Sequence, residues 1–305
     1  MKTLGLDLGG TKIAGAVVEA GRILARRQVP TPRTGYAAVL ASLGDVAAQL
    51  LKDFPEVERV GLGSPGPLDL PAGKVVFAPN IPGLEDAPIA VDLSKKLALP
   101  VVLENDANAA GYAEHLHGAA KTLGSSVYIT VSTGIGGGIF VGDKVIRGAF
   151  GVAGEVGHVT LEPGGPLCGC GHYGCWEALA AGRALARDGS HAYGFAMTTE
   201  EVFRRAQAGE RLALRVVDRA AMYTGLGLAN LVKILDPEGF VLGGGMMKTG
   251  DFYLEKVQAA ADTFTTSFPR VKLYLAELGT DAGVIGAASV AARELGTVEK
   301  RVAQG

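Results

Sequence analysis

The chain has 305 residues, a length at which two domains are expected and a large apolar core can be buried. Its formal charge is −2, from 29 basic and 31 acidic side chains, and 48% of its residues are hydrophobic. This balance excludes an intrinsically disordered chain and disfavours nucleic-acid binding driven by net charge. Glycine is the outlier, because its 45 residues are about twice the usual share of ~7%. The glycines form clusters without a collagen period, which favours loops where the backbone approaches a ligand.

Neither end of the chain nor its interior carries a signal for export or membrane insertion. The charged residue Asp7 stands where a secretory signal would be apolar, so a cytoplasmic protein is expected. The longest uncharged stretch, residues 122–142, is long enough to span a bilayer, but 12 of its 21 residues are Gly, Ser or Thr. We therefore expect no membrane partner. In a reducing compartment the three cysteines favour metal binding over disulfides.

The predicted elements of the first half begin with three short strands separated by turns, at residues 3–7, 12–18 and 23–29. A helix is predicted over residues 36–54 and a strand over 59–63. A buried strand over 101–104 is followed directly by a helix over 106–117.

After Gly118 a second group of three short strands is predicted, at residues 126–131, 137–141 and 144–146. Helices are predicted to dominate residues 199–235, followed by a strand over 239–242 and a closing helix over 282–295. Two similar openings predict two similar α/β halves with a cleft between them, and a boundary near residues 118–124.

Glycine-rich turns indicate phosphate-binding loops. The first spans residues 7–12, Asp-Leu-Gly-Gly-Thr-Lys, where glycine N–H groups and the Thr11 hydroxyl can donate to a phosphate and Asp7 can hold Mg²⁺ through water. The second spans residues 132–138, with four glycines in five positions, and residues 243–245 form a third cluster. The alternative for each is an ordinary glycine hairpin, but three clusters together favour a nucleotide site.

Asp106 is the candidate general base. It lies where a strand gives way to a helix, and a helix N-terminus stabilises the ionised carboxylate that a base requires. Asn105 and Asn108 flank it, and they are two of only four asparagines in the chain. The alternative is that Asn105 or Asp106 is simply the helix N-cap.

The cysteines indicate a zinc site. All three fall within eight residues, with a histidine ten residues before the first: Cys168, Cys170, Cys175 and His158. Three thiolates and one imidazole suit a closed, tetrahedral, structural zinc site, and His172 is a competing ligand. The spacing is not that of a DNA-reading finger. Glu155 and Glu177 bracket the site and can direct carboxylates at sugar hydroxyls; the alternative is solvated surface charge.

Five motifs in this order resemble the ROK family (repressors, open reading frames and sugar kinases), most closely its glucokinase-like members: DLGGTK, ENDANAAGYAE, STGIGGG, AGEVGH and CGCGHYGCWE. The resemblance implies an α/β, actin-like ATPase (ribonuclease-H-like) fold, with two domains flanking a nucleotide and sugar cleft. We expect residues 1–120 to form the first domain, with a C-terminal helix of about 282–305 packing back on it. Residues 121–281 are expected to form the larger, second domain.

The resemblance also implies roles for individual residues, with Asp106 as the catalytic base. The implied sugar-binding residues are Asn80, Asn105, Asp106, Glu155, His158 and Glu177. The residues implied for ATP and Mg²⁺ are Asp7, Gly9, Gly10, Thr11, Lys12, Thr133, Gly134, Gly243 and Gly244. The implied zinc ligands are His158, Cys168, Cys170 and Cys175, so that His158 would serve both metal and sugar.

The activity that the resemblance implies is transfer of the γ-phosphoryl group of ATP to the 6-hydroxyl of a hexose, with glucose as the first candidate. Mg²⁺ and a structural Zn²⁺ are the expected cofactors, and a homodimer or homotetramer is expected. Fructose, mannose and N-acetylhexosamines are alternative substrates. A sugar-responsive repressor is not expected, because the first phosphate loop begins at residue 7 and leaves no room for a DNA-binding helix-turn-helix. An actin-like structural ATPase would have no use for the zinc loop.

Overall fold

The structure, a computed structural model, describes residues 1–78 and 80–302, with the backbone alone after residue 293. Its contacts divide the chain into two compact units. Unit 1 comprises Met1–Lys121, Val145–Val152 and the chain from Glu277 onward, and unit 2 comprises Thr122–Lys144 and Ala153–Ala276. These units are sets of contacting residues, so the domain limits expected from the sequence stay a prediction.

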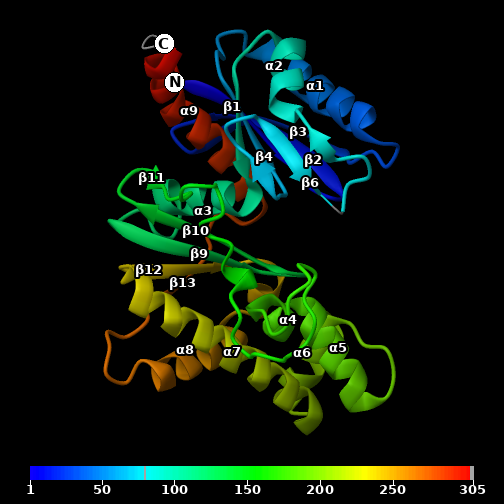
Figure 1. Cartoon of the computed structure of the whole chain (residues 1–305), viewed down its shortest axis with the longest axis vertical. Coiled ribbons are helices and arrows are strands. Elements are labelled where there is room, and N and C mark those ends of the chain that lie inside the picture. Colours follow the sequence, from blue (N-terminus) through cyan, green and yellow to red (C-terminus); the bar gives the residue numbers. More distant parts are fainter. Residues whose placement is uncertain (79, 303–305) are drawn as a thin grey trace. The chain divides into compact units, whose positions relative to one another are not determined.

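Unit 1 is built on a five-stranded sheet with the strand order β3-β2-β1-β4-β8 (Figure 1). The strands are β1 (Lys2–Leu8), β2 (Lys12–Glu19), β3 (Arg22–Pro30), β4 (Val60–Ser64) and β8 (Val101–Asn105). The first three form an antiparallel meander, and β1, β4 and β8 run parallel. A separate small sheet consists of β5 (Leu68–Asp69), β6 (Lys74–Phe77) and β7 (Glu85–Ala87). The helices are α1 (Tyr36–Asp53), α2 (Ile89–Leu97), α3 (Asp106–His117), the 3₁₀ helix η3 (Gly279–Asp281) and α9 (Ala282–Val302).

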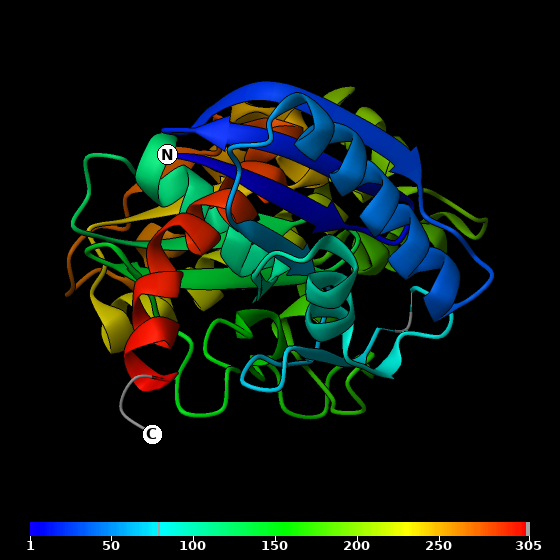
Figure 2. The ribbon, with the colours of Figure 1, turned by 90° about the horizontal axis from the view of Figure 1, so that it is seen from above.

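The two faces of this sheet have different side chains. Leu4, Leu6 and Leu8 alternate along β1 and are fully buried in the core that includes helix α1. The opposite face is lined by small residues, such as Ala14 and Ala16 of β2, in a core with α3 and α9. Helix α9 thus lies beside β1, although nearly the whole chain separates them (Figures 1 and 2).

Three glycines allow this close approach of helix and sheet. A Cβ on Gly5 of β1 would lie 1.9 Å from the carbonyl oxygen of Val284. A Cβ on Gly61 of β4 would lie 1.8 Å from the carbonyl oxygen of Ala287. Within α9, Gly286 approaches α3 so closely that its Cβ would lie 1.6 Å from a backbone oxygen of that helix. Any side chain at these positions would therefore push α9 away from its neighbours.

Unit 2 repeats the topology of unit 1, with the strand order β11-β10-β9-β12-β13. The strands of this sheet are β9 (Ser125–Val131), β10 (Ile135–Val141), β11 (Lys144–Val145), β12 (Gly239–Gly243) and β13 (Leu273–Leu275). The second residue of β11, Val145, begins the segment that is grouped with unit 1. The helices are the 3₁₀ helix η1 (Val156–His158), α4 (Trp176–Ala180), α5 (Gly182–Tyr193), α6 (Thr199–Gln207), α7 (Arg211–Leu235), the 3₁₀ helix η2 (Gly245–Thr249) and α8 (Asp251–Phe264). Buried residues of β9 and β12 pack with those of α4–α8 in a single large core.

The predicted elements are confirmed within a few residues, including both meanders. The matched strand order of the two sheets agrees with the expected two similar halves. The predicted closing helix runs to Val302, and the last three residues proposed for it lie outside the described residues. The small sheet β5–β7 was not predicted, because its strands have only two to four residues. In the part of the chain that the structure describes, no helix has the length and apolar character that crossing a membrane requires.

Replacing Gly61 by Ala should destabilise the protein strongly. The added methyl group would meet backbone rather than a movable side chain, so β4 or α9 must shift, at a cost of about 1–3 kcal/mol or more. Urea unfolding of the purified variant measures this loss.

Gly63→Ala is the matched control, because Gly63 lies on the same strand and its Cβ would meet nothing closer than 3.6 Å. Equal unfolding midpoints for the two variants would contradict the assigned packing of α9.

Candidate functional site

The carboxyl ends of the parallel strands in unit 1 bring the first candidate residues to one edge of the sheet. Asp7 of β1 pairs in register with Gly63 of β4, and Gly63 pairs with Glu104 of β8. Asp106 follows two residues after Glu104, as the first residue of α3. Asp7 and Asp106, 99 positions apart in sequence by their numbers, are thus placed together by strand register. In α/β sheets this edge is the usual position of ligand sites.

The first glycine loop connects β1 to β2 and is held in place by the protein itself. The Gly9 amide donates to the Lys12 carbonyl at 2.9 Å. Thr31, which follows β3, donates from its hydroxyl to the Gly9 carbonyl at 2.6 Å and from its amide to the Thr11 carbonyl at 3.0 Å. Gly10 lies against Asn80, because a Cβ on Gly10 would lie 3.3 Å from the Cβ of Asn80. The loop is therefore preformed, and the turn that carries Asn80 lies beside it.

Asp7 is electrostatically strained. Burial, together with the nearby charge of Asp106, raises the pKa of Asp7 to about 6, whereas Lys12 acts in the opposite direction. Its carboxylate also faces the first turn of α9, where a Cβ on Gly283 would lie 2.7 Å from Asp7 Oδ2. A cation at this position would relieve the unfavourable burial of negative charge.

The start of α3 is capped by Asn105. Its Oδ1 accepts hydrogen bonds from the amides of Ala107 at 2.9 Å and Asn108 at 3.1 Å, so the capping alternative is realised for this residue. The Ala107 amide also donates to Asp106 Oδ1 at 2.8 Å. Asp106 is therefore held at the positive end of the helix, where its ionised form is favoured. The Nδ2 group of Asn105 remains the part of that side chain that can donate to a ligand.

The second glycine loop joins β9 to β10 in unit 2 and contacts Glu177, one of the residues predicted to bind the sugar. Ser132 N donates to Gly134 O at 2.9 Å, which closes the turn. Glu177 Oε2 accepts a hydrogen bond from the Ile135 amide at 2.9 Å, and a Cβ on Gly134 would lie 2.3 Å from the same oxygen. Glu177 therefore supports the loop with one carboxylate oxygen. Thr133, at the tip, is exposed.

The third glycine cluster has a packing role that its sequence does not reveal. Gly244 has φ of 92°, and a Cβ there would lie 2.5 Å from the carbonyl oxygen of Val131. A Cβ on Gly243 would lie 2.5 Å from the hydroxyl oxygen of Tyr128. Both glycines thus let the chain after β12 approach the end of β9, next to the second loop.

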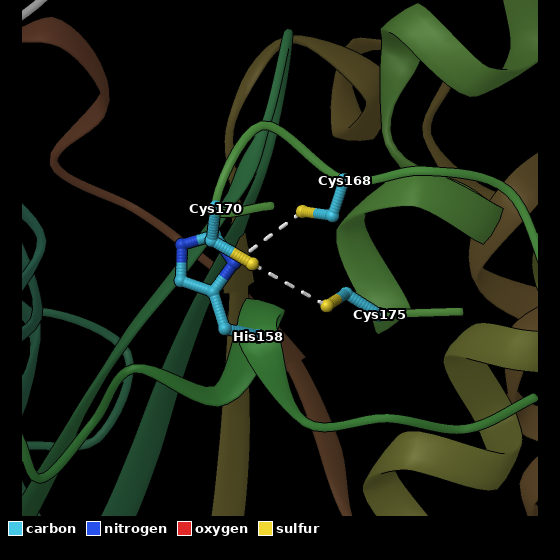
Figure 3. A group of neighbouring side chains, drawn as sticks. All are labelled: His158, Cys168, Cys170 and Cys175. Carbon is cyan, nitrogen blue, oxygen red and sulfur yellow. Dashed lines mark hydrogen bonds between the residues drawn. The ribbon is translucent and has the colours of Figure 1, made fainter. Parts of the chain in front are cut away.

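The predicted metal ligands converge in unit 2 (Figure 3). The ligand atoms of His158, Cys168, Cys170 and Cys175 all lie within 4.8 Å of one another. Cys168 Sγ lies 3.6 Å from His158 Nδ1, and Cys170 Sγ lies 3.6 Å from Cys175 Sγ. Ligands at the usual Zn–S and Zn–N bond lengths of a tetrahedral site are separated by about 3.6–3.8 Å. The donor set and its spacing therefore fit zinc.

The protonation of the thiols differs within the cluster. A hydrogen bond from the His172 backbone lowers the pKa of Cys170 to about 6, whereas burial raises the pKa of Cys175 to about 12. Since thiolates are the metal ligands, zinc binding would release protons from this group. His172 Nδ1 contacts only Cys170 among the three thiols, at 3.7 Å, so His158 is the better-placed imidazole.

The same histidine links the cluster to Glu155. Its Nδ1 faces the sulfur atoms, and its Nε2 lies 4.0 Å from Glu155 Oε2. Both side chains are partly exposed, at 37% and 50%. This arrangement leaves a carboxylate and one imidazole nitrogen accessible at the rim of the cluster.

Each unit thus gathers its own share of the predicted residues. Unit 1 holds the first loop with Asp7, Gly9, Gly10, Thr11 and Lys12, together with Asn80, Asn105 and Asp106. Unit 2 holds the second loop with Thr133 and Gly134, the glycines 243 and 244, Glu155, Glu177 and the metal cluster. The sequence analysis did not single out Thr31, which holds the first loop, or the ion pair between Glu104 and Arg147. Glu104 offered one signal, because a carboxylate ending an apolar strand needs a partner when it is buried.

The pKa of Asp7 makes the stability of the protein depend on pH. The folded state binds the Asp7 proton more tightly than the unfolded chain does. The free energy of unfolding that this proton contributes is therefore lost as pH rises from about 4 to about 6, by up to about 3 kcal/mol. Asp7→Asn should therefore be more stable than the parent protein above pH 6 in buffer without divalent cations. Urea unfolding between pH 4 and pH 8 measures the difference, and a difference independent of pH would contradict it.

Comparison with known proteins identifies the family. Residues 3–294 match the model described as ROK family. A glucokinase of Streptomyces coelicolor is 37% identical over 310 residues, which cover 95% of this chain and 97% of the relative.

Two crystal structures show that the similarity of this chain to ROK proteins extends to the fold. The ROK hexokinase from Thermus thermophilus is 48% identical, with a TM-score of 0.92 and coverage of 97% of this chain and 99% of that one. A ROK family glucokinase from Streptomyces griseus, in complex with glucose and AMPPNP, is 35% identical, with a TM-score of 0.83 and coverage of 96% and 100%. The predicted actin-like ATPase fold is thereby confirmed. This chain belongs to the ROK family.

Proposed function

We propose that this protein is an ATP-dependent hexose kinase that phosphorylates the 6-hydroxyl of glucose. The observation that carries the proposal is the placement of Asp106 at the N-terminus of α3, at the same sheet edge as a preformed glycine loop. Membership of the ROK family, with glucokinases among its relatives, supports the same reaction. Phosphoryl transfer of this kind depends on positioning and charge stabilisation rather than on covalent chemistry.

Asp106 acts in this proposal as the general base. Its carboxylate accepts the proton of the attacking hydroxyl as the bond to phosphorus forms. The positive end of α3 keeps the carboxylate ionised before the reaction. Asn105 donates from Nδ2 to a sugar hydroxyl, while its Oδ1 remains engaged by the helix.

The glycine loops bind the phosphates. Gly10 and Thr11 offer backbone amides, while Gly9 closes the turn through its own amide and the Lys12 carbonyl. The Thr11 hydroxyl is an additional donor, and Lys12 adds a positive charge. Mg²⁺, when bound with ATP, would neutralise phosphate charge, and Asp7 would hold it through water. In unit 2, Thr133 and Gly134 serve as the second loop, with Gly243 and Gly244 next to it.

The remaining residues that we assign to the sugar are polar side chains. Asn80 lies beside the first loop, and Glu155, His158 and Glu177 lie around the metal cluster. Glu177 uses Oε2 for the Ile135 amide, and Cys168 Sγ lies 4.0 Å from its Oε1, the oxygen that we assign to a sugar hydroxyl. His158 would bind Zn²⁺ through Nδ1 and the sugar through Nε2, since metal ligation fixes the orientation of the ring. The proposed role of zinc is structural.

An ADP-release assay with a panel of hexoses tests the reaction. Glucose, fructose, mannose and N-acetylhexosamines are compared at equal concentration, with and without Mg²⁺. Turnover that is highest with glucose supports the proposal, and a preference for another sugar selects one of the alternative substrates. The absence of ADP release with every sugar would contradict a hexose kinase. The proposed homodimer or homotetramer is tested separately by light scattering.

Asp106→Asn should lose at least about 2–3 orders of magnitude in kcat, because the amide cannot accept the hydroxyl proton. Glucose binding, measured by calorimetry, should persist, since the amide keeps the shape of the side chain. Asp45→Asn, at an exposed position on α1, is the control and should keep full activity. Near-normal turnover of Asp106→Asn would remove this residue from the role of base.

His158→Gln and Cys175→Ser should lose zinc, whereas His172→Gln should retain it. The purified parent protein is expected to contain one zinc ion per chain by elemental analysis, since the cluster offers one set of four ligands. Cys170→Ser should lose zinc and sugar affinity together. If His158→Gln retained zinc and His172→Gln lost it, His172 rather than His158 would be the zinc ligand.

A further inference from the structure

A fully buried carboxylate lies immediately before the proposed catalytic base. Glu104 is 0% exposed, at the end of the edge strand β8. Its Oε1 accepts hydrogen bonds from the Asn105 amide and from Asn108 Nδ2, both at 2.9 Å. Its Oε2 accepts from Arg147, through Nε at 2.7 Å and through Nη2. An unpaired charge buried in this way would be strongly unfavourable, so the ion pair with Arg147 stabilises the buried Glu104 carboxylate.

Arg147 reaches Glu104 from a distant part of the chain. The segment Val145–Val152 belongs to unit 1, although the residues before and after it, Lys144 and Ala153, belong to unit 2. The same segment leads within a few residues to Glu155, a proposed sugar contact. Within unit 1, the ion pair therefore fixes the segment Val145–Val152 to the strand that precedes the proposed base.

The contacts of Glu104 determine the geometry on both sides of Asp106. Asn105 precedes Asp106 and caps α3 through its side chain, while its backbone amide is held by Glu104. Asn108 lies in the first turn of α3, where its backbone amide donates to Asn105 Oδ1 and its side-chain Nδ2 donates to Glu104. A rotation of the Glu104 carboxylate would thus release two of the contacts that define the first turn.

The pair also controls local charge. Asp7 is another carboxylate at this edge of the sheet, and the charge of Asp106 helps to raise its pKa. With Arg147 present, Glu104 adds no net charge beside Asp106. Without it, Glu104 would place an unpaired buried charge beside Asp106.

We propose that Arg147 is a positioning residue for the general base, acting through Glu104 to hold Asp106 in its reactive orientation. The proposal rests on the proposed function, because it assigns Asp106 as the base. It predicts a larger effect on the chemical step than on the binding of either substrate, because Arg147 contacts Glu104 and would reach the sugar only through Asn105.

The test compares Arg147→Gln, Glu104→Gln, the double variant and Arg147→Lys with the parent protein, using the preferred hexose of the panel. Arg147→Gln should lower kcat by about 10- to 100-fold, as misplacement of a reacting group by about 1 Å does, with KM for hexose and ATP within about 3-fold. Arg147→Lys keeps the charge and should retain more of kcat than Arg147→Gln. The double variant replaces the ion pair by two amides and should lose less than the product of the single losses.

The control is Lys2→Gln, which removes an exposed ion pair with Glu56 at the opposite end of β1 from Asp7 and should leave kcat unchanged. Calorimetric hexose binding checks that each variant is folded, and Glu104→Gln carries the test if Arg147→Gln does not fold. Parent-like kcat in a folded Arg147→Gln or Glu104→Gln, or equal losses in kcat and in binding, would overturn the positioning role. If the parent protein phosphorylates no hexose, the proposed function itself fails, and Arg147 has no base to position.

Discussion

The position of the proposed base depends on one packing constraint, the absence of side chains where α9 meets the sheet of unit 1. Gly5 and Gly61 leave the backbone of β1 and β4 open, and Gly286 does the same where α9 crosses α3. Interiors are packed as densely as organic crystals, so helices displaced by a methyl group cannot keep the same neighbours. Because α3 carries Asp106 at its first residue and α9 begins beside Asp7, the same contact aligns both carboxylates with the strand ends.

Three carboxylates at this edge are accommodated in three different ways. Glu104 is neutralised by Arg147 and fully hydrogen-bonded, so it can be buried as an anion. Asp106 lies at a helix N-terminus, which favours its ionised form. Asp7 is stabilised less than Glu104 by an ion pair and less than Asp106 by a helix N-terminus, and burial raises its pKa. Of the three, Asp7 is therefore the group that would gain most from a bound cation.

Much of this fold follows from the sequence, because alternation and helical periodicity define the strands and helices, and the two glycine turns mark the repeated meander. The convergence of His158 with the cysteines also follows from residue type and spacing. Pairings between distant residues do not follow. Nothing local to Arg147 indicates that its partner is Glu104, 43 positions earlier, and nothing local to Glu177 indicates a bond to the Ile135 amide. The roles of the site residues in binding and catalysis stay predictions, since they concern ligands rather than the chain.

The return of α9 to unit 1 has a consequence for how the protein is made. On the ribosome, the glycine-lined face of β1 and β4 emerges early, yet the helix that covers it is translated after every residue of unit 2. A nascent chain therefore carries an incomplete unit 1 while unit 2 is being made, and unit 1 is completed only when α9 has emerged.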